Sequence, residues 1–145
     1  MFAISSLVAD LPLFLVDAMT AYTIAGEHGK AVEMADQLTR SQSHLSTLIK
    51  GNVAWTYGRA GERVKAVRIL QELEARAASG YVSPAAMFWT HLGLENIDPA
   101  FSWLERAIDE NSFFVIMGLK SYPQFDPLRS DPRYPTMLQK AGLEP

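Results

Sequence analysis

Apolar and small residues recur along this chain at a fixed, long period. A pattern of Tyr, Gly, Ala and Leu begins at Tyr22 and returns 35 residues later at Tyr57, and a weaker version follows after another 34, at His91. The offsets within the three sets are identical, and a shared period of this length predicts stacked helical hairpins. The sets are Tyr22, Gly26, Ala31 and Leu38; Tyr57, Gly61, Ala66 and Leu73; and His91, Glu95, Ala100 and Ala107.

Each position of the pattern has a physical role in a hairpin of two helices. The Tyr position supplies a packing ring near the end of the first helix. The Gly position lies where that helix ends, and positive φ there favours a residue without Cβ. The Ala position lies in the second helix and lets helices approach closely. The third set lacks the glycine, so we expect its strained residue to be Gly93 or Asn96.

The period, the offsets and the residue types resemble those of the tetratricopeptide repeat, whose repeat is about 34 residues long. The resemblance covers roughly residues 11–108 and is weakest in the third repeat. It implies an all-α fold, a right-handed superhelical stack of antiparallel helix hairpins. We expect a single domain at 1–145, with repeats at about 11–45, 46–80 and 81–111 and a C-terminal cap at 112–145.

A narrower resemblance lies near the end of the chain. The stretch "FDPLRSDPRY", followed by a short helix and "AGL", is similar to the C-terminal repeat and cap of many bacterial multidomain proteins. In that subfamily the repeats commonly follow an effector such as a winged-helix DNA-binding domain, a nucleotide cyclase or a Ser/Thr kinase. The sequence in hand contains no such effector.

Local signals predict where helices begin and end. We expect helices at 11–25, 29–40, 43–60 and 62–78, with Ser43 as the cap of the third. Three further starts combine a capping residue with a first-turn proline. They are Ser83 with Pro84, Asp126 with Pro127, and Asp131 with Pro132.

Two stretches are apolar on more than one face. Residues up to about Asp10 are expected to form an incomplete helix over the first repeat, because Asp10, Pro12 and Asp17 interrupt any signal peptide or membrane span. This end lacks a polar cap, which makes it a candidate self-association face. The second stretch, at 112–120, is expected to be buried as half of a fourth hairpin.

Charged side chains favour structural interpretations over binding ones. Arg68, Glu72 and Arg76 stand four residues apart on one predicted helix and are expected to form a solvated charge ladder. Arg129 and Arg133 have acidic neighbours in the sequence, which favours local salt bridges over anion binding.

Composition narrows the classes of function. The 145 residues fit one domain, and 48% hydrophobic with 20% charged residues is typical of a globular protein. The net charge of −3 gives no electrostatic reason to expect nucleic acid. The absence of Cys excludes thiolate nucleophiles and Cys-based zinc sites, and it is compatible with the reducing cytoplasm in which we expect the protein.

Motifs for catalysis or cofactor binding are missing. The sequence contains no Walker A loop, dinucleotide fingerprint or G-x-S-x-G elbow. His28, His44 and His91 are far apart, and His91 is best explained as a substitute for a packing tyrosine. We therefore expect no enzyme activity, no cofactor, no metal, and neither nucleic acid nor membrane as a partner.

The repeat register predicts a binding surface. In tetratricopeptide proteins the first helix of each repeat lines a concave groove. Trp55 and Trp89 are one repeat apart and should stack on the same side, beside Gly51 and Gly58. They form either a pocket for an apolar side chain or, with slightly more weight, part of a core in which the glycines let neighbouring helices approach. The candidate groove residues are Leu13, Val16, Thr20, Thr23, Leu48, Gly51, Trp55, Gly58, Arg59, Ala85, Trp89 and Leu92.

The leading hypothesis is therefore a non-enzymatic protein-protein interaction module that binds an apolar peptide or helix in its groove. The first alternative is homo-oligomerisation through the apolar N-terminal face, since exposed apolar surface normally marks an interface. The second is a regulatory C-terminal part of a larger bacterial transcription factor, cyclase or kinase. The identity of the partner stays open.

Overall fold

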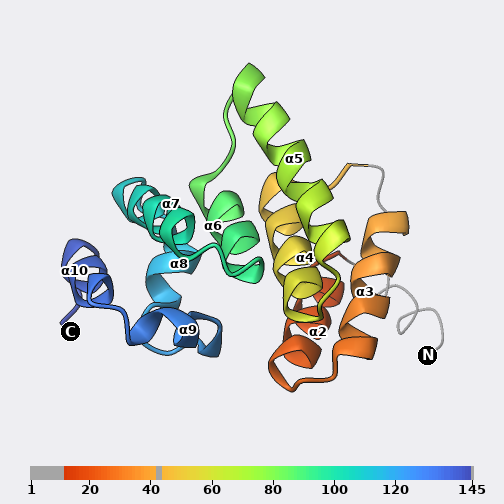
Figure 1. Ribbon diagram of the computed structural model, residues 1–145, viewed down its shortest axis with the longest axis horizontal. Coiled ribbons are helices and arrows are strands. Elements are labelled where there is room, and N and C mark those ends of the chain that lie inside the picture. Colours follow the sequence, from red (N-terminus) through yellow and green to blue (C-terminus); the bar gives the residue numbers. More distant parts are fainter. Residues whose placement is uncertain (1–11, 42–43, 145) are drawn as a thin grey trace.

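Helices make up most of the described backbone of this chain (Figure 1). The computed structural model describes residues 12–41 and 44–144, with side chains from residue 14 onward, and within those ranges it contains no strand. The elements are α2 (Pro12–Ile24), α3 (His28–Ser41), α4 (Thr47–Arg59), α5 (Arg63–Ser79), α6 (Pro84–Gly93), α7 (Ile97–Asp109), α8 (Phe113–Gly118), the 3-10 turn η1 (Pro123–Phe125), α9 (Asp126–Arg129) and α10 (Arg133–Lys140).

Consecutive helices pair into hairpins. Helix α2 packs on α3, α4 on α5 and α6 on α7, and the first helices of the pairs also contact one another, α2 on α4 and α4 on α6. The short elements from α8 to α10 follow the third pair and lie at the opposite end of the molecule from α3 (Figure 1). The expectation of an all-α fold is confirmed for the described residues.

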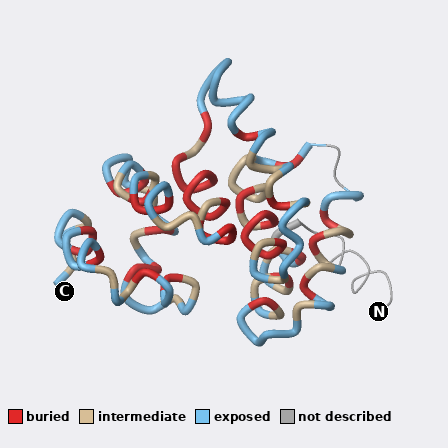
Figure 2. Tube along the Cα trace, viewed as in Figure 1, coloured by how far each residue is buried: buried red, intermediate tan, exposed pale blue. Residues whose placement is uncertain are grey.

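Small residues lie between the helices where the sequence pattern predicts close approach. Ala31, Ala66 and Ala100 have no exposed surface, and neither do Leu38 and Leu73. Figure 2 shows buried segments that alternate with exposed ones along the helices. A larger side chain at the Ala positions would push paired helices apart, because protein interiors are already close-packed.

The first two hairpins turn at glycine, as the pattern predicts. Gly26 and Gly61 have φ of 78° and 82°, in the left-handed region that costs most residues about 1–2 kcal/mol. In both turns the amide of the next residue donates to the carbonyl of the pattern's tyrosine, from Glu27 to Tyr22 at 2.9 Å and from Glu62 to Tyr57 at 2.8 Å.

The third hairpin keeps this turn without the glycine, and the expected position of its strain was wrong. Glu95 itself has φ of 60°, while the Asn96 amide donates to the His91 carbonyl at 2.9 Å. Gly93 lies inside α6, where its missing Cβ is needed because the Trp55 Cα would be 2.5 Å away. Asn96 places its side-chain amide 3.1 Å from the His91 ring instead.

Helix starts agree with the sequence signals except at α4. Ser46, three residues after the expected cap, accepts a hydrogen bond from the Ile49 amide at 3.2 Å; Ser43 lies outside the described residues. In the tail, α9 begins at Asp126, and α10 begins at Arg133, whose amide donates to the Asp131 carboxylate at 2.9 Å. Both tail helices begin within two residues of the expected starts, but Asp126 is the first residue of α9 rather than its cap. Ser83, the expected cap of α6, also forms no side-chain capping bond.

Helix α8 is not buried in the way the sequence suggested. Phe113 and Phe114 are 66% and 61% exposed, and Met117 is also exposed, whereas Val115 and Leu119 are fully buried. The helix has only six residues and only one of its faces meets the rest of the molecule. The expectation of a fully buried fourth hairpin was therefore wrong.

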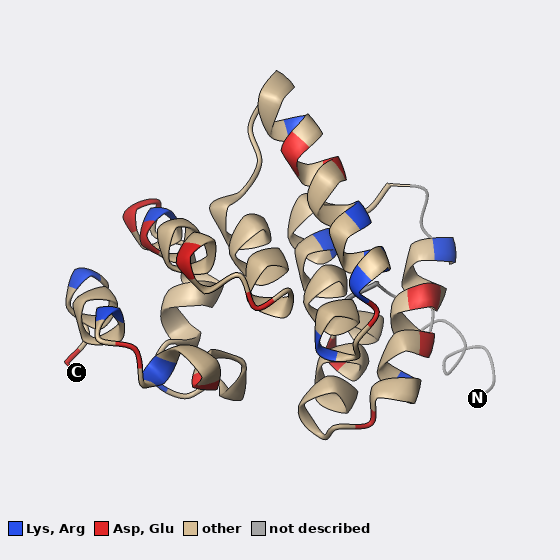
Figure 3. Cartoon of the chain, in the orientation of Figure 1, with Lys and Arg blue, Asp and Glu red and all other residues tan. Residues whose placement is uncertain are grey.

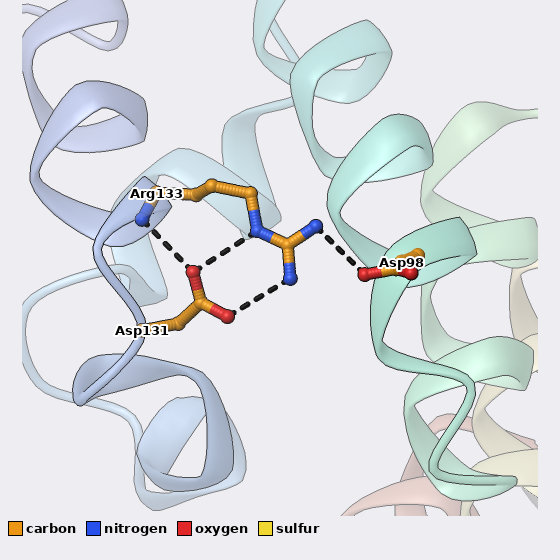
Figure 4. Close-up of polar contacts among 3 residues, drawn as sticks. All are labelled: Asp98, Asp131 and Arg133. Carbon is orange, nitrogen blue, oxygen red and sulfur yellow. Dashed lines mark hydrogen bonds and ion pairs between the residues drawn. The ribbon is translucent and has the colours of Figure 1, made fainter.

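Ion pairs attach the tail to the third hairpin. Arg133 binds both carboxylate oxygens of Asp131, at 3.0 and 2.9 Å, and reaches Asp98 on α7 at 2.9 Å (Figure 4). Its hydrogen bonds lower the pKa of Asp131 to about 2. Arg129 pairs with Asp126. The predicted local salt bridges are thus confirmed, and Asp98 adds a contact between distant parts of the sequence.

None of the helices that the structure describes is long and apolar enough to span a membrane. The expected incomplete helix over residues 1–10 lies outside the described residues.

Candidate functional site

The two tryptophans of the first helices meet, as their spacing of one repeat predicts. The rings of Trp55 on α4 and Trp89 on α6 have centroids 6.2 Å apart and are inclined by 67°, an edge-to-face contact. They are only 3% and 5% exposed. They therefore belong to the hydrophobic core, which is the structural alternative that the sequence left open, and they do not form an open binding wall.

Glycines beside these tryptophans serve helix packing. A Cβ on Gly51 would lie 2.6 Å from the Ala86 carbonyl oxygen, and one on Gly58 would lie 2.1 Å from that of Gly93. The backbones of α4 and α6 therefore touch at these glycines. The functional interpretation had placed a pocket for an apolar side chain there. That interpretation was wrong at these two positions, because the neighbouring helix fills the space.

The tail covers the middle of the predicted groove. Phe125 of η1 has no exposed surface, and its ring lies 5.5 Å from Phe88 and 5.4 Å from Trp89. Arg129 holds this segment by donating to the carbonyl oxygens of Leu119, at 3.2 Å, and Tyr122, at 2.9 Å. The chain thus supplies its own aromatic side chain to the surface where a partner was expected.

A cavity of about 450 Å³ remains beside Trp55, between the ends of the first helices and the tail. We call it the Trp55 cavity. Four candidate groove residues lie in its wall: Thr23, Trp55, Arg59 and Leu92. The tail and the end of α2 contribute the rest of the wall: Ile24, Pro123, Gln124, Asp126 and Pro127.

The other candidate groove residues do not line this cavity. The side chain of Leu13 lies outside the described part of the structure, and Val16, Thr20 and Leu48 are half-buried elsewhere on the first helices. Gly51, Gly58, Ala85 and Trp89 lie in the contact between α4 and α6 or in the core.

Polar groups of the Trp55 cavity differ in how well they are satisfied. The Thr23 hydroxyl donates to the Met19 carbonyl at 2.7 Å and is used internally. The Arg59 guanidinium has only a loose partner, Glu95, at 3.8 Å. The buried side-chain oxygen of Gln124 accepts no hydrogen bond from any described residue. The cavity therefore offers the weakly paired Arg59 cation and the exposed Asp126 carboxylate beside apolar walls, while the Gln124 oxygen is enclosed in the wall.

The lining does not include a nucleophile with a base beside it. His91 is half-buried outside the cavity, and burial lowers its pKa below the ordinary value. Over the ranges 12–41 and 44–144, the structure contains no cluster of three His, Cys, Asp or Glu side chains able to hold a metal.

Sequence reasoning missed the tail half of this site. The tail residues of the cavity wall follow the third repeat by many residues, so the repeat register does not predict their position. They are Pro123, Gln124, Asp126 and Pro127. The motif "FDPLRSDPRY" was a signal that the tail is folded, but the contact of Phe125 with Phe88 and Trp89 of α6 depends on tertiary packing.

Comparison of the chain with family models, with curated proteins and with solved structures finds no match. The functional argument therefore depends on the geometry of the molecule.

Proposed function

We propose that this chain is a non-enzymatic protein-interaction module of the tetratricopeptide type, in which stacked hairpins support a peptide-binding site. Support comes from the buried Ala positions and from the shared turn geometry of the three hairpins. The proposed stack is a right-handed superhelix capped by the segment from α8 to α10.

The observation that carries the proposal is the Trp55 cavity. Its volume of about 450 Å³ lies within the range of about 300–1,000 Å³ that is usual for ligand sites. Ile24, which is 46% exposed, and Leu92 supply apolar wall on opposite sides of Trp55 along the row of first helices. In this proposal one apolar side chain of a partner peptide enters here.

The polar groups set the orientation of that peptide. In this proposal the Gln124 amide rotates so that its oxygen, which is enclosed in the wall without a donor, accepts from a backbone N–H beside the inserted side chain. The Arg59 guanidinium meets a carbonyl or carboxylate oxygen of the peptide, because its contact with Glu95 is long and exposed.

The test selects peptides from a random displayed library on the wild-type protein and measures their affinity by fluorescence anisotropy. Ile24→Asp should weaken binding by about tenfold or more, since it introduces a charge into the apolar wall. Val64→Asp is the matched control, because Val64 is an exposed residue of α5 that lies outside the cavity. Equal affinity of both variants would contradict the proposal.

A second candidate, homo-oligomerisation, is favoured by the surface of α2. Phe14 and Ile24 are each 46% exposed, and this helix contains no Lys or Arg. In this alternative a second copy covers that surface. A sedimentation experiment should then find a dimer that Phe14→Lys converts to monomer, and a wild-type monomer at high concentration would exclude it. Phe14 is outside the Trp55 cavity, so the two candidates are separable.

A further inference from the structure

A second cavity, of about 350 Å³, lies between α3 and α5 and shares no lining residue with the Trp55 cavity. We call it the Asp36 cavity. Its floor contains the Tyr57 ring and Ile69, and most of its remaining wall is charged. Figure 3 shows basic positions along α5 and at the upper end of α3. The full lining is Asp36, Thr39, Arg40, Tyr57, Lys65, Arg68, Ile69 and Glu72.

The Asp36 carboxylate in this cavity is already satisfied. Its Oδ1 accepts from the Tyr57 hydroxyl at 2.6 Å and from Lys65 Nζ at 3.2 Å. Burial opposes the ionised form of Asp36, but these two hydrogen bonds outweigh it and lower the pKa below its ordinary value. Burial, followed by the bond to Asp36, raises the pKa of Tyr57 to about 12, so the phenol remains a donor near neutral pH.

The other acid of the cavity is also paired. Glu72 accepts from Lys50 of α4 at 3.0 Å. The predicted charge ladder along α5 is therefore not made of ion pairs, because Glu72 turns to α4 and forms none with Arg68 or Arg76 among the described side chains. This pairing leaves the positive charge of Arg68 unmatched.

Two guanidinium groups have no counter-charge within ion-pair distance among the described residues, although the charge of Arg40 also helps to lower the pKa of Asp36. Arg40 and Arg68 are both exposed, both line the Asp36 cavity, and neither forms an ion pair with a residue in the described ranges. The cavity wall contains three basic and two acidic side chains, and Lys50, which lies outside the wall, pairs with Glu72. These six side chains together carry two excess positive charges on a chain whose net charge is −3. Like charges in the wall of one cavity repel each other, and a bound anion offsets that repulsion.

We propose that the Asp36 cavity is a binding site for a phosphate monoester, held between Arg40 and Arg68. A phosphate monoester carries about −1.5 to −2 charges at neutral pH, which matches the two excess cations. The planar guanidinium fork binds such oxyanions by paired N–H donors. The Tyr57 ring and Ile69 provide apolar surface for the group that bears the phosphate.

The phosphate could belong to a phosphorylated side chain of a partner or to a small phosphorylated metabolite, and the recognition chemistry is the same. The site shares no residue with the Trp55 cavity. The phosphate-binding proposal can therefore be tested independently of the proposed peptide-binding function.

The experiment follows arginine Nε–Hε signals by NMR while the whole chain is titrated with inorganic phosphate, a phosphoserine peptide or a sugar phosphate. We expect saturable shifts at Arg40 and Arg68. Stronger binding of the peptide than of the sugar phosphate would assign the source to a protein partner, and the reverse order to a metabolite. No saturable shift with any of the three would overturn the proposal.

Variants separate this site from general electrostatic attraction. Arg40→Gln and Arg68→Gln should each weaken binding about tenfold, the effect of losing one charge-assisted contact. Arg76→Gln is the matched control, since Arg76 is an exposed arginine of the same helix that lies outside the cavity. An equal loss with Arg76→Gln would contradict a specific site. Asp36→Asn should tighten binding, because it removes the nearest negative charge.

Discussion

The core of the first two hairpins differs in kind from the core of the third hairpin and the tail. The first cluster is aliphatic, with Leu15, Met19, Leu38 and Val53 packed around small residues and Tyr57 as its aromatic member. The second cluster is rich in aromatic rings, which include Phe88, Trp89, Phe101 and Phe125, and Trp55 joins it from α4 of the second hairpin. Figure 2 shows buried positions in both halves of the molecule.

The difference shows how the two halves are specified. In the first half, each apolar residue meets partners that the repeat register already pairs with it. In the second half, the rings of Phe88 and Trp89 are covered by Phe125, which comes from outside the repeats. A regular repeat can therefore end where a non-repeating segment supplies the last layer of core.

The largest expected loss of stability comes from removing a ring from the aromatic core of the third hairpin and the tail. Phe125→Ala should lower the free energy of unfolding by about 3–5 kcal/mol, because it removes a fully buried ring that packs on two others. Leu38→Ala, in the aliphatic half, should cost about 2–5 kcal/mol. Urea unfolding followed by circular dichroism measures both. Only Phe125→Ala should also shift the tryptophan emission, and an unchanged emission would contradict the contact with Trp89.

The next effect separates two reasons for glycine in this fold, which are close approach of helices and positive φ. Gly58→Ala should destabilise the fold by about 1–3 kcal/mol or more, because the new Cβ would meet the Gly93 backbone, which has no room to move. Gly61→Ala meets no atom within 4 Å but has φ of 82°, so its cost should be about 1–2 kcal/mol. Gly29→Ala, which has neither restriction, is the control and should be neutral or slightly stabilising. A harmless Gly58→Ala would exclude the tight contact of α4 with α6.

Alkaline pH should affect both halves through one buried tyrosine each. Burial is the main cause that raises the pKa of Tyr57, and likewise that of Tyr134, to about 12, against about 10 in the unfolded chain. The neutral phenol thus stabilises the fold fully below about pH 10, and this contribution is lost as pH rises towards about 12. Phenolate absorbance should show groups that titrate near pH 12, and Tyr57→Phe and Tyr134→Phe should each remove one.

The smallest expected change in stability concerns the turn of the third hairpin, which lacks the glycine of the first two turns. Glu95→Gly should raise the free energy of unfolding by about 0.5–1 kcal/mol, because it gives the third turn the residue that the first two use at positive φ. Its contact with Arg59 is long and exposed, so little is lost there. Glu95→Ala is the control and should not stabilise. Thermal unfolding of the three proteins measures the difference.

Sequence reasoning was most accurate where short-range physics decides. The Ala positions, the glycine turns at Gly26 and Gly61 and the approximate tail starts near Asp126 and Asp131 were confirmed, since each depends on a few neighbouring residues. It was wrong about the third turn and about α8, where the position of a helix against another element decides which residue is strained or exposed. Four of the candidate groove residues line the Trp55 cavity, and their role in binding stays a prediction.

The sequence by itself determined which residues form helices and which faces of those helices are apolar, because the period and the turn residues encode both locally. The tertiary structure alone decided what covers each face. An apolar stripe on a helix predicts that this face is buried. It does not predict which segment covers the face, because the hydrophobic effect is non-directional. Here the tail supplied Phe125 to the row of first helices, and that placement turned an expected open groove into a core with one cavity at its edge.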